Sequence, residues 1–349
     1  MRILLLPIAF FHYIILKIRH KLYDWRIIKT KKYDMPVICV GNLALGGTGK
    51  TPHVEYLADL LSETYRVCIV SRGYGRKTKG FQLANGSCNA ETVGDEPVQY
   101  ANKFSDVMVA VDENRNRAIE LMDTIDRPPE VFLLDDAFQH RSIEAGLNLL
   151  LTAYDKLYSN DFLFPAGTLR DIKSAARRAD IIMVTKTPEQ LDKLEKAEMI
   201  GQLNPLPQQK VFFSSIVYEP LKAVNQVPIN FDPENAESVL LFCGIARPQG
   251  LLEELKHRYK QVELVKFADH HPYTENDVKR ILEKFGQLKG EKKIVVTTEK
   301  DLARFTNSPY LCQFDAVPLF VAPISVKIDQ EEKFNEEILS YVRKNAHYS

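Results

Sequence analysis

The sequence lacks the features that would take it out of the class of ordinary globular proteins. Its five cysteines are scattered and none forms a C-x-x-C pair, which excludes a disulfide scaffold and a zinc ribbon. Lys+Arg and Asp+Glu balance at 46 each, so overall charge points to no nucleic-acid partner. There is no internal repeat and no low-complexity tract. We therefore expect reduced, mostly buried thiols in a reducing compartment.

Long hydrophobic runs are also missing. The longest, ILLLPIAFFHYIIL at 3–16, has 14 residues and is interrupted by Pro7 and His12, so it is too short to span a bilayer. No small-residue cleavage site follows it, which disfavours a removable signal peptide. The next segment, 17–32, carries seven Lys/Arg and one Asp. This pattern predicts an amphipathic helix within residues 1–30 that lies on an anionic membrane surface, with packing on its own domain as the alternative.

What the sequence does contain is an alternation of short apolar runs and helical patterns from residue 36 onward. Such alternation is typical of a mostly parallel sheet with helices on both faces. Around 203–236 the composition shifts toward Pro, Asn and Gln, and the alternation then restarts. We expect a first α/β domain over 31–210, a connector over 211–236 and a smaller α/β domain over 237–349.

The stretch NLALGGTGKTP at 42–52 follows an apolar run and precedes a helical pattern. Its glycines allow successive backbone N–H groups to face phosphate oxygens, Lys50 would reach the outer phosphates, and the Thr51 hydroxyl would bind Mg²⁺. The strict motif has glycine at position 44, where this chain has alanine. A structural glycine turn is the alternative. The predicted nucleotide-binding residues are Ala44, Leu45, Gly46, Gly47, Thr48, Gly49, Lys50 and Thr51.

Carboxylates follow two other segments. Asp135 and Asp136 come directly after the apolar run VFLL, the arrangement of a Walker B metal site, although a single such residue is often only a helix cap. Asp95 and Glu96 in VGDEP could serve as a base and a metal partner or simply cap the helix beginning at Pro97, and the spacing alone does not decide.

A third group, Asp269-His270-His271, follows an apolar run in the second domain. Two adjacent histidines without a further ligand are weak evidence for zinc, whereas an Asp–His pair that handles a proton is reasonable chemistry. Thr274, three residues before Asp277, predicts a helix cap.

Two further absences bear on which class of nucleotide-binding protein this is and which base it binds. Position 45 is leucine, where ATPases with the deviant phosphate loop have a signature lysine, so that class is disfavoured. The segment VTKTPE at 184–189 is similar to the guanine-reading motif of GTPases but has Pro188 in place of the aspartate. Without this acceptor, ATP is favoured over GTP.

Seven motifs together resemble the tetraacyldisaccharide 4′-kinase family, the lipid A 4′-kinases of Gram-negative bacteria. In order they are VGNLALGGTGKTP, SRGYGR, GDEP, LDDAFQHR, FPAGTLRD, ADHHPY and TTEKD, between the apolar N-terminus and about residue 325. Ala137 and Asp171 are small departures, because the family usually has Gly and often Glu there. The resemblance implies transfer of the ATP γ-phosphoryl group to the 4′-hydroxyl of a tetraacylated glucosamine disaccharide 1-phosphate, at the cytoplasmic face of the inner membrane.

The resemblance also implies roles for individual residues. Asp95 would take the proton of the hydroxyl group, and His270, from the other domain, would tune or relay it once the cleft closes. Lys50 and Mg²⁺ would stabilise the developing charge. The candidate metal-binding residues are Thr51, Asp135, Asp136 and Glu96. The candidate substrate-binding residues are Arg72, Arg76, Gln139, His140, Arg170, Asp171 and Asp269.

Two other functions remain possible from the residues alone. One is a soluble P-loop kinase of a small metabolite, for which the N-terminal segment would be dispensable. The other is a nucleotide-dependent switch, which would not need the Asp95–His270 pair.

Overall fold

The computed structural model describes residues 2–225, 232–305 and 309–346. The described residues form two main sheets and a separate two-strand pair, and the largest sheet has nine strands. In spatial order these are β16 (Ile324–Ile328), β10 (Lys210–Tyr218), β9 (Ile181–Thr185), β8 (Leu147–Ala153), β2 (Val37–Asn42), β6 (Val131–Asp135), β3 (Val67–Ser71), β5 (Met108–Val111) and β4 (Gln82–Ala84). The pairs β16–β10 and β4–β5 are antiparallel, and the other neighbours are parallel.

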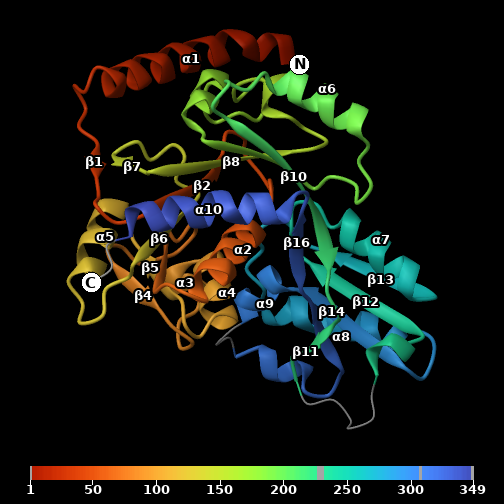
Figure 1. The fold of residues 1–349 in the computed structure, drawn as a ribbon. Helices are drawn as coiled ribbons and strands as arrows, with labels where there is room; N and C mark the ends of the chain where they lie inside the picture. The colour runs from red at the N-terminus through yellow and green to blue at the C-terminus, as the bar shows by residue number, and fades with distance from the viewer. Residues whose placement is uncertain (1, 226–231, 306–308, 347–349) are drawn as a thin grey trace.

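The central strands of the large sheet are buried on both faces, which is why their sequences read as continuous apolar runs. Figure 1 shows helices on either side of this sheet. One face is covered by α2 (Lys50–Ser62), α4 (Asp95–Lys103) and α10 (Glu331–Asn345). The other is covered by α1 (Arg2–Asp24), α5 (Arg115–Asp123), α6 (Lys193–Leu203) and the 3₁₀ turn Lys173–Arg178. Shorter elements are α3 (Ala90–Val93), the 3₁₀ turn Tyr158–Asn160 and the two-strand pair of β1 (Lys31–Lys32) with β7 (Ile143–Glu144).

The smaller sheet has five strands. Their order is β11 (Lys222–Ala223), β15 (Leu319–Ala322), β14 (Lys293–Thr298), β12 (Ser238–Cys243) and β13 (Gln261–Lys266). Helix α7 (Gln249–Arg258) covers one face, and α8 (Glu275–Gln287) covers the other together with α9 (Glu299–Phe305). Two 3₁₀ turns, Pro233–Asn235 and Leu311–Phe314, complete this small-sheet unit.

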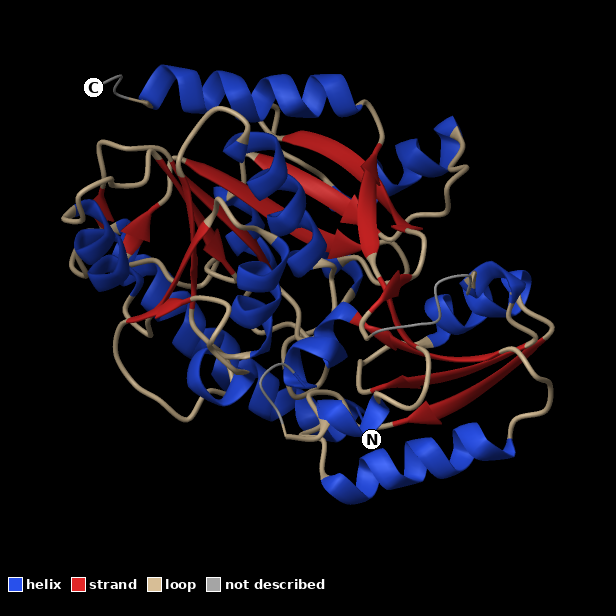
Figure 2. Ribbon diagram, turned by 90° about the horizontal axis from the view of Figure 1, so that it is seen from below, coloured by secondary structure: helices blue, strands red, loops and turns tan. Residues whose placement is uncertain are grey.

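The division of the chain differs from the predicted boundaries at both ends of the small-sheet unit. The predicted connector begins inside β10, which pairs with β9 over Lys210–Phe213 and belongs to the large sheet. The last strand β16 returns to pair with β10, and the helix α10 lies along the outside of the large sheet (Figure 2). The apolar face of α10, with Phe334, Ile338 and Val342, shares a core with α2, a long-range partnership that no local pattern encodes.

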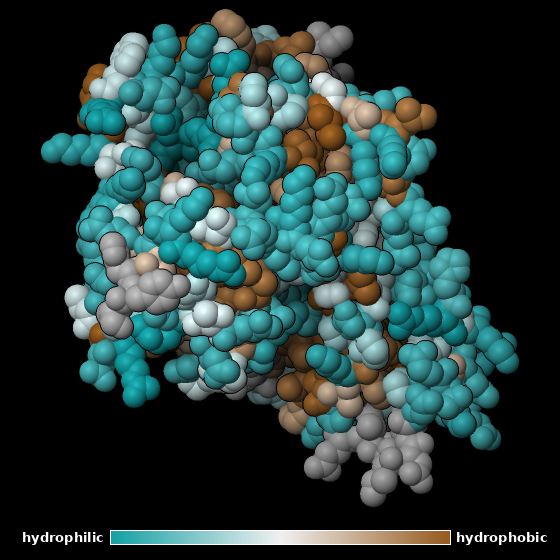
Figure 3. Space-filling view, viewed as in Figure 1, coloured by the Kyte–Doolittle hydropathy of each residue, from teal (hydrophilic) through white to brown (hydrophobic). Residues whose placement is uncertain are grey.

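The predicted N-terminal helix is present as α1 and runs along one end of the large-sheet unit (Figure 1). Ala9 and Leu16 are buried, whereas Phe10, Phe11, Ile15 and Ile18 are exposed. Hydrophobic atoms accordingly reach the surface along the upper edge of the molecule in Figure 3, where this helix lies. Among the described residues we find no helix with enough apolar length to cross a bilayer.

Candidate functional site

The glycine-rich loop connects β2 to α2, as its sequence predicts, and is braced from several sides. Gly46 and Gly49 have φ values of 99° and 82°, a left-handed conformation that glycine adopts without strain. The Asn42 side-chain amide donates to Thr48 Oγ1 over 2.6 Å, and Thr185 Oγ1 donates to the carbonyl of Thr48 over 2.8 Å. These bonds fix the loop in a shape whose N–H groups can receive phosphate oxygens.

The motif FPAGTLRD contributes a second brace to the same loop. The Leu45 N–H donates to the carbonyl of Thr168 over 2.7 Å, and the Arg170 N–H donates to that of Leu43 over 2.8 Å. The Arg170 guanidinium bonds the Asn42 side chain and pairs with Asp136. This motif, whose role the sequence does not reveal, therefore holds the phosphate loop against the carboxylates.

Asp135 and Asp136 lie beside the loop because β6 pairs directly with β2 in parallel register. The Asp136 carboxylate is 3.7 Å from Lys50 Nζ. Burial alone would raise the pKa of Asp136, but the charges of Lys50 and Arg170 outweigh burial and lower it. Asp136 is therefore an ionised group with two cationic partners.

Asp135 has the opposite electrostatic environment. Its burial, followed by the neighbouring charges of Asp136 and Glu96, raises the pKa of Asp135 to about 7. Ser71 Oγ donates to this carboxylate over 3.2 Å. A buried carboxylate surrounded by negative charge, close to a threonine at the start of a phosphate-loop helix, is the environment in which a divalent cation is stabilising. Three or more acidic, His or Cys residues gathered as a metal site do not occur in the described part of the chain.

The Asp95–His270 pair predicted across the two units is formed in the structure. Asp95 is the first residue of α4, and His270 follows β13. His270 Nδ1 lies 2.9 Å from Asp95 Oδ2. Arg304 Nε donates to the same Asp95 oxygen over 2.8 Å. Burial would raise the pKa of Asp95, but the hydrogen bond from His270 and the charge of Arg304 lower it below its usual value. Lys300 Nζ lies 3.2 Å from His270 Nε2 and 3.0 Å from Glu96 Oε1.

His271, in contrast, has a structural role. Its Nε2 is 3.0 Å from Asp277 Oδ2, and its ring stacks on Phe267. The predicted cap is confirmed, since Thr274 and Asp277 form a capping box at the start of α8.

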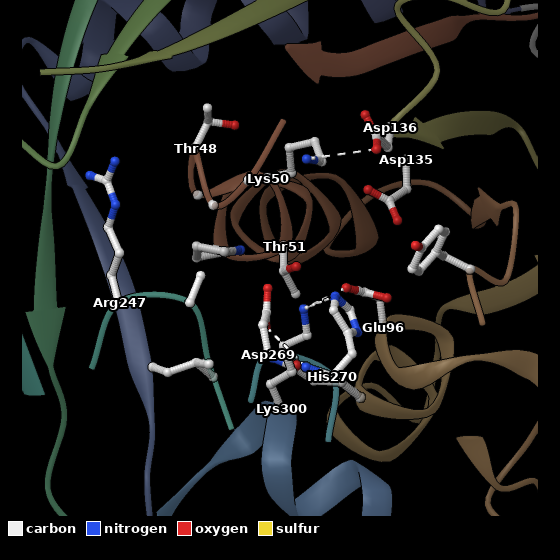
Figure 4. A pocket seen from close by; sticks show the side chains of 18 of the residues that line it. Thr48, Lys50, Thr51, Glu96, Asp135, Asp136, Arg247, Asp269, His270 and Lys300 are labelled. Atoms are coloured by element: carbon white, nitrogen blue, oxygen red, sulfur yellow. Dashed lines mark hydrogen bonds and ion pairs between the residues drawn. The ribbon is translucent and has the colours of Figure 1, made fainter. Parts of the chain in front are cut away.

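A cavity of about 1140 Å³ lies between the two sheets and collects most of the predicted residues. Figure 4 shows the side chains of Lys50, Asp135 and His270 converging on it from both units. The predicted residues that line it are the loop 44–51, Arg72, Glu96, Asp135, Asp136, Gln139, His140, Arg170, Asp269 and His270.

Three predicted residues do not line this cavity. Asp95 lies next to His270, outside the lining. Arg76 pairs with Glu113 over 2.9 Å and holds the Gly80 carbonyl, so it organises its own loop. Asp171 is fully buried and accepts a 2.6 Å hydrogen bond from His20 of α1. We therefore do not carry Arg76 and Asp171 forward as substrate contacts.

The cavity also has cationic residues that sequence reasoning missed, namely Arg19, Arg115, Lys186, Arg247 and Lys300. Arg115 is 5% exposed, and its Nε is buried without a hydrogen-bond partner. Burial and the charge of Arg72 lower the pKa of Arg115. Three of these residues had a local signal, because Lys300 belongs to TTEKD, Lys186 to the GTPase-like segment and Arg19 to the basic segment 17–32, whereas Arg115 and Arg247 had none.

Three residues that line the cavity have a left-handed backbone although they are not glycines. Their φ values are 48° for Asp136, 59° for Lys186 and 56° for His270. Such conformations cost on the order of 1–3 kcal/mol and occur preferentially at functional sites, where the surrounding contacts impose them. The other such residues in the described chain, Arg26, Asn204 and Gln330, lie at helix ends, so these three backbone conformations agree with a functional role of the cavity without establishing it by themselves.

Comparison with known proteins gives a consistent result. Residues 1–343 match the family model described as tetraacyldisaccharide-1-P 4′-kinase. The tetraacyldisaccharide 4′-kinase of Bacteroides thetaiotaomicron is 41% identical over 99% of this chain and 94% of its own. That of Flavobacterium johnsoniae is 42% identical over 99% of this chain and 98% of its own. A crystal structure of an "apo" form LpxK from Aquifex aeolicus in complex with ATP superposes with a TM-score of 0.74 at 30% identity, covering 99% of both chains. The predicted α/β architecture of the P-loop class is thereby confirmed.

Proposed function

The chain belongs to the tetraacyldisaccharide-1-P 4′-kinase family, and from this premise we propose how its residues act. It is an ATP-dependent phosphotransferase that transfers the γ-phosphoryl group to the 4′-hydroxyl of a tetraacyldisaccharide 1-phosphate. The observation that carries the mechanism is that the phosphate loop and His270, which is paired with Asp95, line the same cavity.

On the nucleotide side, the N–H groups of the loop 44–51 hold the phosphates, and Lys50 stabilises negative charge on the transferred group. Asp136 and Arg170 keep the Lys50 side chain directed along the loop. We assign the adenine and ribose to the part of the cavity lined by Arg247, which lies on the other side of Thr48 from Asp135 and Asp136 (Figure 4). Lys186, which also lines the cavity, lies beside Gly47 of the loop.

Thr51 and Asp135 are the residues that we propose for Mg²⁺, with Glu96 and Asp136 nearby. Asp136 is engaged by Lys50 and Arg170, and Glu96 by Lys300, which leaves Asp135 as the carboxylate whose environment most favours a cation. The ion would neutralise charge on the phosphate oxygens.

On the acceptor side, Asp95 is the final acceptor of the hydroxyl proton. His270 lines the cavity and Asp95 does not, so His270 lies where it can orient the hydroxyl group or relay its proton to Asp95. The new bond joins the acceptor oxygen to the γ-phosphorus atom, the bond to the β-phosphate oxygen breaks, and ADP leaves.

The acidic sugar phosphate fits the other end of the cavity. Arg19, Arg72, Arg115 and Arg170 line it together with Gln139 and His140. Arg19 comes from α1 and donates to the carbonyl of Gln139 over 2.9 Å, so the N-terminal helix directly adjoins this cationic region. Guanidinium groups that are held in place in this way suit a phosphate monoester.

An apolar surface beside α1 favours a lipid substrate with acyl chains over a small soluble metabolite. An apolar cavity of about 500 Å³ lies between α1 and the segment 161–174, lined by Ala9, Phe10, Phe162, Leu163 and Ile172 among others. With the exposed apolar residues of α1 and the basic segment that follows it, this surface suits peripheral attachment to an anionic leaflet. We assign the protein to the cytoplasmic face of the inner membrane, where ATP is available.

The test is transfer of labelled γ-phosphate from ATP to a tetraacyldisaccharide 1-phosphate in detergent micelles. We expect transfer that needs the lipid and Mg²⁺, stops with a chelator and resumes when Mg²⁺ is added back. Asp95→Asn and His270→Ala should reduce kcat by about 10²- to 10⁴-fold, the usual contribution of acid–base catalysis. ATP binding without transfer to the lipid would favour the soluble-kinase alternative, and full activity of Asp95→Asn would refute the proposed base.

A further inference from the structure

The motif TTEKD has no role in the mechanism described so far, although it begins the helix that faces the catalytic pair. It ends β14 and starts α9 in the small-sheet unit. Asp301 anchors this turn from a fully buried position, where it accepts hydrogen bonds from Gly244 N, Thr298 Oγ1 and the Tyr273 hydroxyl. Helix α9 is thereby fixed to the small-sheet unit, and other polar side chains of this helix can contact the large-sheet unit.

Two of those side chains, one helical turn apart, reach the catalytic pair. Arg304 Nε donates to Asp95 Oδ2 over 2.8 Å, and its Nη1 donates to Gly244 O and Asp301 Oδ1. The Arg304 side chain is 5% exposed, so its geometry is fixed by packing as well as by these bonds. Arg304 therefore holds one oxygen of Asp95 in a defined orientation.

Lys300 acts on the other member of the pair. An ammonium group has only donors, so its 3.2 Å contact with His270 Nε2 is a hydrogen bond only if Nε2 carries a lone pair. The ring proton then resides on Nδ1, from which it is donated to Asp95 Oδ2 over 2.9 Å. A doubly protonated His270 would place two cationic donors against each other. Glu96 fixes the Lys300 ammonium from the large-sheet unit over 3.0 Å.

We propose that Lys300 and Arg304 are positioning residues of the phosphoryl transfer. Lys300 selects the neutral Nδ1–H tautomer of His270, and Arg304 fixes the Asp95 carboxylate that accepts the hydrogen bond from this Nδ1–H group. Because both side chains come from α9 while Asp95 and Glu96 come from α4, these contacts exist only when the two units are in the relative position seen here. The same residues thus couple closure of the cleft to assembly of the proton-handling pair.

This inference rests on the proposed function for its catalytic consequence, but its structural part can be measured without turnover. The first experiment records long-range ¹H–¹⁵N correlations of the imidazole rings in the full-length protein at neutral pH, with the His270 signals assigned by His270→Gln. We expect a neutral Nδ1–H ring in the wild type and loss of that single tautomer in Lys300→Met. A wild-type ring that is Nε2–H or doubly protonated would overturn the proposal.

The second experiment measures steady-state kinetics for the same variants. Lys300→Met and Arg304→Gln should lower kcat by about 10- to 100-fold, the loss expected from misplaced reacting groups, with the KM for ATP changed less than about twofold. Lys300→Arg and Arg304→Lys, which keep the charge, should recover part of kcat. The matched control is Lys279→Met on α8, whose lysine forms an exposed pair with Glu275 within its own helix.

The outcomes distinguish failure of the proposed positioning role from failure of the proposed function. Equal kcat in Lys300→Met and the wild type, or no recovery by Lys300→Arg in a variant with an unchanged melting temperature, would refute the positioning role. Absence of transfer in the wild type itself would refute the proposed function, while the imidazole spectra would still decide whether Lys300 selects the tautomer.

Discussion

His53 makes a sharp test of how the phosphate loop is tied to the rest of the large sheet. It lies in the first turn of α2 and is 1% exposed. Its Nδ1 is 2.7 Å from the carbonyl of Gly49, and its Nε2 is 2.9 Å from Ser214 Oγ in β10. A carbonyl only accepts, so Nδ1 carries the proton and Nε2 accepts from the serine. This neutral ring links the last glycine of the loop to the strand that continues toward the small-sheet unit.

The magnitude follows from the shift in its pKa. Burial is the main cause, and the pKa of His53 falls from 6.5 to about 4. Because the folded-state pKa lies below that of the unfolded chain, the unfolded state takes up the proton first as the pH falls. The stability is therefore fully present above pH 6.5 and is lost progressively toward pH 4. A difference of about 2.5 pH units, at about 1.4 kcal/mol per unit, amounts to about 3.5 kcal/mol, of which about 3 kcal/mol is lost by pH 4, where the folded ring is half protonated.

The assay is urea unfolding of the wild type and His53→Gln at pH 7.5 and pH 4. All other titrating groups are shared, so the difference between the two proteins isolates His53. We expect the wild type to lose about 3 kcal/mol more than the variant between these pH values. Equal losses in both proteins would refute the reasoning, because they would mean that His53 is protonated as readily in the folded protein as in the unfolded chain.

Two further predictions concern packing around the site. In Gly41→Ala the new Cβ would lie 2.7 Å from Phe138 Cβ, so we expect the free energy of unfolding in urea to fall by about 1–3 kcal/mol and phosphoryl transfer to weaken. The control is Gly201→Ala, whose Cβ would have nothing within 4 Å and which should be neutral or stabilising. In His20→Ala the buried Asp171 carboxylate loses its 2.6 Å partner but keeps Arg178 and the Ile172 N–H, so we expect about 1–3 kcal/mol of destabilisation and faster tryptic cleavage after α1. Unchanged cleavage would mean that the His20–Asp171 pair does not hold the helix.

Most of the secondary structure was predictable because it is encoded locally. The apolar runs of the central strands, the glycine-rich loop and the capping box of Thr274 and Asp277 can each be recognised from a few neighbouring residues, and the structure confirms them. Helix α6 and strand β16 were not predicted, because neither stands out in the pattern of its own segment. The role of β16 depends on pairing with β10, more than a hundred residues earlier in the chain.

The residues of the candidate site likewise fall into those that the local sequence predicts and those that it does not. The loop 44–51 and the acidic residues after β6 could be placed from sequence, because parallel strands end at a common edge of a sheet. Arg115 and Arg247 could not, because single arginines in ordinary loops and helices give no signal until the fold brings them to the cavity. Arg76 and Asp171 were expected at the substrate and are instead paired with Glu113 and with His20, partners distant in the sequence.

The sequence by itself determined the chemistry that depends on neighbouring residues: a phosphate loop, a pair of acidic residues after a strand, and an apolar and basic N-terminal helix. Hydrogen-bonding geometry and the periodicity of burial act over a few residues, so their signature stays in the local pattern. Tertiary structure alone decided that Lys300 and Arg304 reach His270 and Asp95, that Glu96 faces a lysine, and that the pKa of Asp135 is raised. Electrostatic interactions and desolvation depend on distance in space, and that distance exists only once the two sheets have closed on one cavity.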